Sequence, residues 1–302
     1  MTIFEVANFL NAKLIERNNN TVIGRIEEIS SVKFNRDCLG WCSDKNMFLL
    51  DDLKSGTIII SEATFENLIH SKGDDYFFNC IVTANPRLAF AEVLKHFYVK
   101  PINFGIIHPS VVIDSTVNYK KEYVNLAPNV VIEEGVILGN NIVIGANTVI
   151  KSNTIIEDDV KIGSNCTIGG VGFGYEQDED GIYQLIPHIG NVHIKSRVEI
   201  GNNTCIDRAV IGSTVLESEV KVDNLVHIAH GVNIGSNSLV IAHAMIAGSV
   251  KIGENTWVAP CASIRQKLNI GSNVTIGMGS VVVKNIPSGD IVAGVPAKKI
   301  NN

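Results

Sequence analysis

Histidine and cysteine are among the residues of this chain that could serve as bases, nucleophiles or metal ligands. The six cysteines are scattered, without a CxxC pair and without the paired histidine spacing of a zinc site. We therefore expect reduced thiols. Two of the eight histidines, His227 and His230, lie close together in the sequence. Because imidazole titrates near neutral pH, a histidine in a binding site can take a proton from a reacting group.

The element that must position these side chains is a repeat with an aliphatic residue at every sixth place. A period of six matches neither a helix nor an alternating strand, but it fits a solenoid in which three hexapeptides form one triangular coil. Glycine often follows the aliphatic residue and Asn, Ser and Thr fill the turns, as corners with unusual dihedrals require. The repeat predicts a mainly β protein, a parallel β-helix with these inward residues: Leu126, Ile132, Leu138, Ile144, Ile150, Ile156, Ile162, Ile168, Ile194, Ile200, Ile206, Val210, Leu216, Val222, Ile228, Ile234, Val240, Ile246, Ile252, Val258, Ile264, Ile270, Ile276 and Val282.

Two interruptions and one boundary divide the chain. Residues 170–188 are too polar and glycine-rich to form coils, so we expect an extruded loop there. A slip of two residues between Ile206 and Val210 is expected to form a bulge. Residues 1–104 lack the period, so we expect a small α/β domain there. We expect the β-helix in residues 105–302. In the small domain we expect helices from Ile3 to Leu14 and Pro86 to Phe97, and strands from Thr57 to Ser61 and Ile81 to Thr83.

Composition narrows the possible partners. With 31 acidic and 25 basic residues the formal charge is −6, and no run of Lys or Arg could neutralise a phosphate backbone, so nucleic acid is not an expected partner. No stretch approaches the roughly 20 apolar residues of a membrane span. The first residues read as an amphipathic helix and not as a secretory signal, so we expect a cytoplasmic protein.

The repeats resemble the hexapeptide acyltransferase superfamily, and the segment Ser280 to Ile300, SVVVKNIPSGDIVAGVPAKKI, is similar to the closing segment of its CoA-using sugar acetyltransferases. More narrowly, the chain resembles the lipid A enzymes that are UDP-3-O-(3-hydroxyacyl)glucosamine N-acyltransferases. This resemblance spans nearly the whole chain and is carried by NPRLAFAEVL (Asn85 to Leu94), IIHPSVVID (Ile106 to Asp114), GFGY (Gly172 to Tyr175) and the block Val198 to Gly235, with its IDR and DNLVHIAH motifs. It implies a left-handed β-helix, a homotrimer, no metal or tightly bound cofactor, and a phosphopantetheine arm in the groove between neighbouring helices.

The resemblance also implies roles for single residues. His230 matches the family's catalytic histidine, which removes a proton from the sugar amine as the amine attacks the thioester. The α/β domain would recognise the nucleotide sugar. Backbone amides near Gly248 are expected to supply an oxyanion donor. The substrate-binding candidates are Trp41 and Asp44 in WCSDKN for the base, Phe173, Gly174 and Tyr175 for the sugar and acyl chain, Asp223 and Asn224 for the sugar, His227 to orient His230, and His243 near the acyl groove.

Three departures from the family's pattern argue for a different substrate. Met47 stands where a second aromatic completes the base site, although Phe48 is adjacent. Lys267 replaces a second histidine, and His243 replaces a glycine near the acyl groove, which suits a shorter acyl chain. The chain also stops two residues after AGVPAKKI, without the helices that help hold the acyl carrier protein.

These departures favour acyl-CoA as the donor and a nucleotide-linked deoxyamino sugar as the acceptor, for a surface polysaccharide or glycoprotein, as in the anthrose-pathway N-acyltransferase. The candidates for CoA binding are then Gly248, Arg265, Lys267, Lys298 and Lys299.

Three alternatives stay open. The first is the lipid A N-acyltransferase itself, using acyl carrier protein. The second is a non-catalytic β-helix binding protein, which would be expected to lack His230. The third is a metal enzyme of the carbonic anhydrase type with ligands among His193, His227, His230 and His243, whose spacing does not favour such a site; measuring bound zinc would test it.

Overall fold

The structure is a computed structural model that describes residues 1–19 and 21–300. The chain divides into two compact units, Met1–Ile102 and Asn103–Asn302. Each unit has a hydrophobic core of its own, so the two are independent packing units. None of the helices in the described residues has the length and apolar character that a membrane span requires.

The N-terminal unit is an α/β fold around a sheet with the strand order β1-β5-β4-β3-β2, in which only the β1–β5 pair is antiparallel. Side chains alternate between its two faces. Ile59 and Ile81 pack against residues of α1 and α3, whereas Ile58 and Ile60 pack against η1 and α2. The elements are α1 (Ile3–Phe9), β1 (Lys13–Ile15), β2 (Arg25–Ile26), β3 (Cys38–Trp41), η1 (Asp44–Leu50), β4 (Thr57–Ile60), α2 (Glu62–Lys72), β5 (Asn79–Val82) and α3 (Pro86–Phe97).

The predicted helix from Ile3 to Leu14 is wrong in its second half. Thr2 and Glu5 form a capping box at the start of α1, but the helix ends at Phe9. Asn11 adopts φ +47°, which turns the chain, and the following residues form β1 beside β5. Pairing with the sheet outweighs the helical pattern there. The helix Pro86–Phe97 is confirmed, with the side chain of Asn85 accepting a hydrogen bond from the Leu88 amide.

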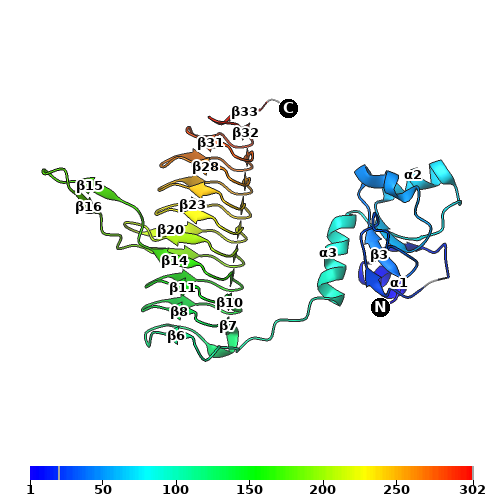
Figure 1. The fold of residues 1–302 in the computed structure, drawn as a ribbon, viewed down its shortest axis with the longest axis horizontal. Helices are drawn as coiled ribbons and strands as arrows, with labels where there is room; N and C mark the ends of the chain where they lie inside the picture. The colour runs from blue at the N-terminus through cyan, green and yellow to red at the C-terminus, as the bar shows by residue number, and fades with distance from the viewer. Residues whose placement is uncertain (20, 301–302) are drawn as a thin grey trace. The chain divides into compact units, whose positions relative to one another are not determined.

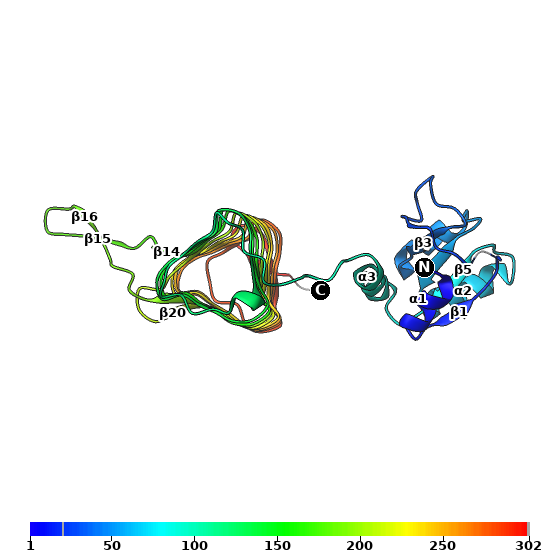
Figure 2. The same ribbon diagram turned by 90° about the horizontal axis from the view of Figure 1, so that it is seen from below.

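The second unit is a left-handed parallel β-helix, and its fold prediction is confirmed. Figure 2 shows its three-sided cross-section, and Figure 1 shows the coils stacked along the axis. The first side consists of β7 (Val124–Leu126), β10 (Ile142–Ile144), β13 (Lys161–Ile162), β18 (Glu199–Ile200), β21 (Lys221–Val222), β24 (Leu239–Val240), β27 (Trp257–Val258), β30 (Thr275–Ile276), β32 (Ile291–Ala293) and the antiparallel β33 (Lys298–Lys299).

The other two sides are built in the same way. The second side consists of β6 (Val112–Ile113), β8 (Val131–Ile132), β11 (Val149–Ile150), β14 (Thr167–Gly170), β19 (Cys205–Asp207), β22 (His227–Ile228), β25 (Met245–Ile246), β28 (Ser263–Ile264) and β31 (Val281–Val282). The third consists of β9 (Ile137–Leu138), β12 (Ile155–Ile156), β17 (Asn191–Ile194), β20 (Ser213–Leu216), β23 (Asn233–Ile234), β26 (Lys251–Ile252) and β29 (Asn269–Ile270). A short 3-10 turn, η2 (Lys121–Tyr123), precedes β7.

The core of the β-helix is formed by the predicted aliphatic series. Val222, Val240 and Val258 stack in register on successive coils, as expected. Every other predicted inward residue except Val210 is also buried. A second buried position, two residues before each aliphatic residue, was not predicted from the sequence. At several of these positions a hydroxyl bonds to the next coil, as from Thr148 to the carbonyl of Gly163 at 2.7 Å.

The left-handed φ values at the corners and the glycines after the aliphatic residues have different structural reasons. The sequence interpretation, which explained both by unusual dihedrals, is corrected here. Among the non-glycine residues, left-handed φ values at the corners occur most often at asparagines, among them Asn147 at +60°. Except for Gly169, at φ +89°, the glycines that follow the inward aliphatic residues have ordinary φ values. They are needed because a Cβ at Gly145 would lie 2.6 Å from the backbone of Gly163 on the next coil. Close approach of the coils, and not unusual dihedrals, selects glycine there.

Both interruptions are larger structures than predicted. Residues leaving β14 form an antiparallel hairpin of β15 (Tyr175–Gln177) and β16 (Tyr183–Leu185), which projects from the coils in Figures 1 and 2. At the shift of the repeat register after Ile206, the chain leaves the coil and bulges out to the surface. Val210 is only half-buried and Ile211 is 80% exposed, while Ala209 is buried in place of the expected residue. The prediction of Val210 as an inward residue is therefore wrong.

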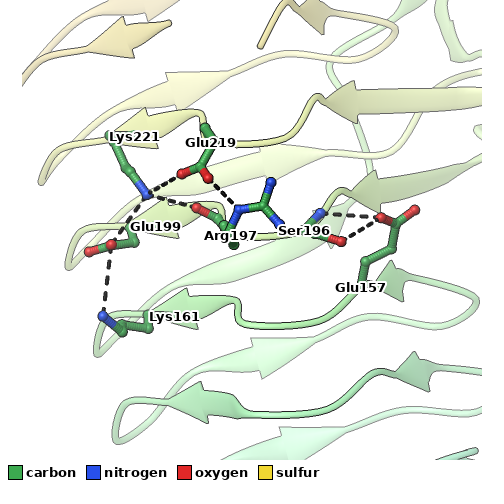
Figure 3. Close-up of polar contacts among 7 residues, drawn as sticks. All are labelled: Glu157, Lys161, Ser196, Arg197, Glu199, Glu219 and Lys221. Atoms are coloured by element: carbon green, nitrogen blue, oxygen red, sulfur yellow. Dashed lines mark hydrogen bonds and ion pairs between the residues drawn. The ribbon is translucent and has the colours of Figure 1, made fainter. Parts of the chain in front are cut away.

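Charged side chains tie neighbouring coils together on the first side of the β-helix (Figure 3). Lys221 lies 3.2 Å from Glu199 and 3.4 Å from Glu219, Arg197 pairs with Glu219, and Lys161 lies 3.8 Å from Glu199. Exposed pairs of this kind contribute about 0–1 kcal/mol each. They favour the alignment of the coils, but the buried aliphatic stacks supply most of the stability.

Candidate active site

A corner of the β-helix positions His230. Ile228 on β22 points inward and is fully buried, and the chain turns outward two residues later. Successive coils pair Ile228 with Ile246 and Ile246 with Ile264, so His230, Gly248 and Gln266 form a column along the same edge. The carbonyl of His230 accepts a hydrogen bond from the Ser249 amide at 2.9 Å.

Gly248 gives the imidazole of His230 its space. A Cβ at this position would lie 2.6 Å from Nε2 and 2.7 Å from Cε1 of His230. Real Cβ atoms do not approach other atoms so closely, so any larger residue would displace the ring. The side chain of His230 thus lies across the next coil, with its Nε2 edge against a glycine.

The hairpin segment and this column enclose a cavity of about 830 Å³. Phe173 and Tyr175 pack with ring centroids 4.9 Å apart, and Phe173 is 87% exposed. Six residues predicted from the sequence therefore meet here, together with five that were not predicted. The lining residues are Phe173, Gly174, Tyr175, Glu176, Tyr183, Ile186, His230, Gly248, Ser249, Gln266 and Lys267.

The electrostatics of the cavity suit a neutral imidazole. Burial lowers the pKa of His230 below its ordinary value, and the charge of the neighbouring His188 lowers it further. A lowered pKa leaves His230 unprotonated near neutral pH, which is the form that can accept a proton. His188 lies where the hairpin returns to the coils, and its ring centroid is 5.2 Å from that of His230. His188 was not among the residues predicted from the sequence.

Four of the other candidates lie elsewhere on the β-helix. Asp223 lines a separate hollow of about 720 Å³ over the first side, and its carboxylate accepts hydrogen bonds from Asn224. His243 occupies a corner with φ +61°. Lys298 is in β33 on the last coil. None of these four residues lines the cavity of His230 within one chain.

His227 contacts Asp207, with Nε2 3.7 Å from Oδ2. The predicted role of His227 in orienting His230 stays a prediction. Arg265 follows β28 one residue before Gln266, and its amide donates to the Val282 carbonyl. Lys267 alone of the predicted cations lines the cavity.

A second cavity, of about 460 Å³, lies in the N-terminal unit. Trp41, Asn46 and Phe90 are among its lining residues, and the rings of Trp41 and Phe90 are tilted with centroids 6.5 Å apart. Phe90, on α3, supplies the second aromatic face. From the sequence this face was considered only at Met47 or the adjacent Phe48. An aromatic pair beside an amide side chain can stack on a planar base and bond to its edge.

Asp44 has a structural role instead of a place in that cavity. Its carboxylate accepts hydrogen bonds from the hydroxyls of Ser61 and Thr64 at the start of α2, which lowers its pKa. Met47 packs on the core and Phe48 is 64% exposed. The carboxylate of Asp44 therefore fixes the turn that carries Asn46.

No group of three or more His, Cys, Asp or Glu side chains in residues 1–19 and 21–300 is arranged to hold a metal ion. The four histidines considered for such a site do not converge. His193 instead bonds to Glu157 at 2.9 Å on the third side of the β-helix. The chemistry that the His230 cavity offers is proton transfer beside an open binding groove.

Comparison with known proteins places this geometry in a family. Residues 139–170 match the model of the bacterial transferase hexapeptide (six repeats). The chain is 34% identical to UDP-3-O-acylglucosamine N-acyltransferase 1 of Francisella tularensis over 266 residues, which covers 82% of this chain and 75% of that protein. It is 51% identical over 141 residues to the UDP-3-O-acylglucosamine N-acyltransferase of Desulfotalea psychrophila, or 47% of this chain and 41% of that protein.

Solved structures show the same fold at lower identity. The UDP-N-acetylglucosamine acyltransferase of Francisella novicida matches with a TM-score of 0.60 at 21% identity, over 65% of this chain and 70% of that one. The corresponding enzyme of Bacteroides fragilis gives 0.58 at 24%, over 65% and 74%. The matches with the Desulfotalea protein and with UDP-3-O-acylglucosamine N-acyltransferase 2 of Legionella pneumophila span 41% and 43% of the length of those relatives. On the strength of the Francisella tularensis match, the chain belongs to the UDP-3-O-acylglucosamine N-acyltransferase family.

Proposed function

We propose that this protein transfers an acyl group from a phosphopantetheine thioester to the amino group of a UDP-linked 3-O-acylglucosamine. The observation that carries the proposal is the position of His230. Its imidazole is neutral near pH 7, lies in a cavity of about 830 Å³ and faces a glycine instead of a side chain. A base in an open groove is what an amine needs in order to become a nucleophile.

In the proposed reaction the amine nitrogen attacks the thioester carbonyl. The C–N bond forms, the C–S bond breaks, and His230 takes a proton from the nitrogen. The same proton then passes to the departing sulfur, which leaves as a thiol, so the base is restored. The column of Gly248 and Gln266 above His230 provides a narrow track along the coils for an extended arm, with Lys267 beside it.

The nucleotide would bind in the N-terminal unit. Trp41 and Phe90 offer two aromatic faces and Asn46 an amide to a uracil ring. Stacking of this kind holds a planar base with little dependence on its identity, whereas the amide can read its edge. We assign the specificity for the base to Asn46 and the binding energy to the aromatic pair.

The choice of acceptor corrects the preference drawn from the sequence. Together, the three departures named in the sequence analysis favoured a deoxyamino sugar and acyl-CoA. The names of the relatives favour a 3-O-acylglucosamine acceptor instead. His243 lies outside the lining of the cavity beside His230 in the single chain. Coenzyme A and acyl carrier protein share the phosphopantetheine arm. The experiment below therefore compares the two as donors.

We further propose that the protein works as a homotrimer. Asp223 lies over the first side of the β-helix and His230 at the edge beyond the second. If both contact one sugar, they must come from neighbouring copies. Light scattering on the purified protein should give three times the chain mass of 32.7 kDa, and a monomeric mass would contradict the assembly.

The activity is tested with two acceptors and two donors. UDP-3-O-(3-hydroxyacyl)glucosamine and a dTDP-linked deoxyamino sugar are each incubated with a 3-hydroxyacyl carrier protein and with 3-hydroxybutyryl-CoA. Released thiol gives the rate, and mass spectrometry identifies the amide. We expect transfer to the glucosamine derivative. Acylation of the deoxyamino sugar alone would contradict the proposal and restore the substrate favoured by the sequence.

A further inference from the structure

The cavity of the N-terminal unit is lined by two adjacent glutamates, Glu27 and Glu28, that the proposed function does not use. Both follow β2, in which Ile26 pairs with Leu39 of β3. The hydrogen-bond ladder continues beyond the strand, because the Glu27 amide donates to the Leu39 carbonyl at 3.2 Å. The two glutamates therefore lie beside β3, the strand that ends in Trp41.

The side chains of the two glutamates belong to opposite faces of the sheet. Ile26 packs in one hydrophobic cluster with the aromatic pair Trp41 and Phe90, whereas Ile29 packs in the cluster on the other face. Successive side chains of an extended segment alternate between the two faces. Glu28, two residues after Ile26, therefore shares the face of the aromatic pair, and the preceding glutamate shares the face of Ile29.

Glu27 has a partner of opposite charge on its own face. Arg25, two residues earlier, pairs with Cys38 in the sheet and donates a hydrogen bond to its thiol at 3.1 Å. This hydrogen bond and, to a lesser extent, the nearby charge of Glu27 raise the pKa of the Arg25 guanidinium. The charge of Glu27 is thus compensated on the face away from the aromatic pair.

The carboxylate of Glu28 has no such partner. Among the described residues, Glu28 is hydrogen-bonded only through its backbone, where its carbonyl accepts from the Ser31 amide at 2.9 Å. The residue is exposed at the edge of the cavity. An ionised carboxylate has two acceptor oxygens and no hydrogen to donate, so it binds hydroxyl or N–H groups and repels phosphate oxygens.

A uracil nucleotide held by the aromatic pair offers few donors to this carboxylate. The base has one N–H, at N3, which the side-chain oxygen of Asn46 can accept, and the ionised diphosphate has none. The ribose is joined directly to the base and carries two adjacent hydroxyls. Two neighbouring hydroxyls match the two oxygens of one carboxylate, and acidic residues hold the ribose 2′-hydroxyl in this way in dinucleotide sites.

We propose that the carboxylate of Glu28 accepts hydrogen bonds from the ribose 2′- and 3′-hydroxyls and makes the cavity select ribonucleotides over 2′-deoxyribonucleotides. The assignment rests on the proposed function for the kind of ligand that enters the cavity. Uracil and thymine stack equally well on Trp41 and Phe90, and they present the same polar edge to Asn46. A dTDP-linked sugar lacks the 2′-hydroxyl and loses one of the two hydrogen bonds. The choice between UDP-linked and dTDP-linked substrates therefore falls to Glu28.

Binding of UDP and dUDP to the full chain tests the assignment, because the two ligands differ only in the 2′-hydroxyl. Isothermal titration calorimetry gives the Kd of each. For the wild type we expect dUDP to bind about tenfold more weakly than UDP, the effect of one hydrogen bond to a charged group. In Glu28→Ala we expect UDP binding to weaken by about tenfold or more, and the ratio of the two Kd values to fall to about one.

Two variants serve as controls for the loss of charge. Glu66→Ala removes an exposed glutamate of α2 that lies outside the cavity lining, and Glu27→Ala removes the neighbouring carboxylate on the opposite face. Both should keep the wild-type ratio. Tighter binding of UDP in Glu28→Ala would mean that Glu28 repels the diphosphate, and it would overturn the assignment. An equal ratio in Glu28→Ala and wild type would also overturn it.

The wild-type ratio is measured without any variant, so the test does not depend on the folding of Glu28→Ala. A ratio of about one in the wild type would overturn the assignment. The expected discrimination without any acyl transfer would contradict the proposed function and leave the role of Glu28 standing. Acyl transfer to the UDP-linked glucosamine, with equal binding of UDP and dUDP, would overturn the assignment alone.

Discussion

One wall of the cavity beside His230 consists of residues on successive coils of one repeat, whereas the cavity beside Trp41 joins side chains from a strand and a distant helix. In the first, His230, Gly248 and Gln266 follow each other at the same edge because the coils pair in register. In the second, Trp41 on β3 meets Phe90 on α3 only through tertiary packing. A repeat converts sequence spacing into spatial position, and an α/β fold does not.

The two cavities also differ in what should happen when they are altered. The cavity of the β-helix holds the group that we assign to the chemistry, so changes there should lower kcat. The cavity of the N-terminal unit holds a remote part of the substrate, so changes there should raise KM. The following predictions, in decreasing order of effect, test this division.

Replacing His230 by Ala should give the largest loss. We expect turnover to fall by ~10² or more, because the base that accepts the proton of the amine is removed. Thiol release under saturating substrate measures kcat. His108→Ala, on the exposed first coil, is the control and should be near normal. Near-normal turnover of His230→Ala would show that the proton has another acceptor. It would also contradict the assignment of the chemistry to the β-helix cavity.

Replacing Gly248 by Ala should act through the ring that it faces. The added methyl would lie 2.6 Å from Nε2 of His230, so the imidazole must move. A displacement of about 1 Å in a catalytic group can cost on the order of 10²-fold, and we expect kcat to fall by at least about tenfold. Gly24→Ala, where the nearest atom is 3.4 Å away, is the control. An unchanged kcat would mean that His230 does not work from the position seen here.

Removing one aromatic face of the other cavity should affect binding. We expect Trp41→Ala to raise KM for the nucleotide sugar about tenfold, equivalent to about 1.4 kcal/mol, with little change in kcat. The control is Phe48→Ala, because Phe48 is 64% exposed and outside the cavity lining. A fall in kcat with KM unchanged would indicate that Trp41 acts in the packing of the unit and not on the base.

The smallest effect is in the pH dependence of the unaltered protein. His230 must be neutral to act, so kcat/KM should fall as the pH drops through its pKa. Because burial and His188 lower that pKa, the acid limb should lie below 6.5, the ordinary value for histidine. A limb above 6.5 would be the behaviour of a histidine with a raised pKa and would contradict the environment described for His230.

Much of the β-helix could be predicted from the sequence, because the period of six repeats one geometrical demand many times. The failure at Val210 shows the limit of that reasoning. Paired residues on successive coils are usually eighteen apart in the sequence. Ile194 pairs with Leu216, so the coil between β17 and β20 contains four extra residues. A sequence shift of two was read as a small bulge, because periodicity alone does not reveal how many residues leave the coil. Only the buried Ala209 and the exposed Ile211 show where the chain departs.

The site was predicted in part, and the missing parts share a cause. Phe173, Tyr175 and Lys267 line the cavity of His230 as expected. His188 and Phe90 were not predicted, because each lies near a ring from another segment of the chain. No periodicity in the sequence indicates such contacts. Asp44 was placed by resemblance in the base site, but its carboxylate bonds to Thr64 at the start of α2, because side-chain partners depend on neighbours far away in the sequence.

The sequence by itself determined the solenoid, the inward aliphatic stacks and the edge on which His230 lies, because those follow from local spacing repeated over many coils. Tertiary structure alone decided that the hairpin returns His188 to within 5.2 Å of His230 and that α3 brings Phe90 to Trp41. The physical reason is that a coil fixes positions through contacts with its immediate neighbours. A buried pair of rings from distant segments exists only after the intervening chain has packed, and its electrostatic coupling exists only in that packed state.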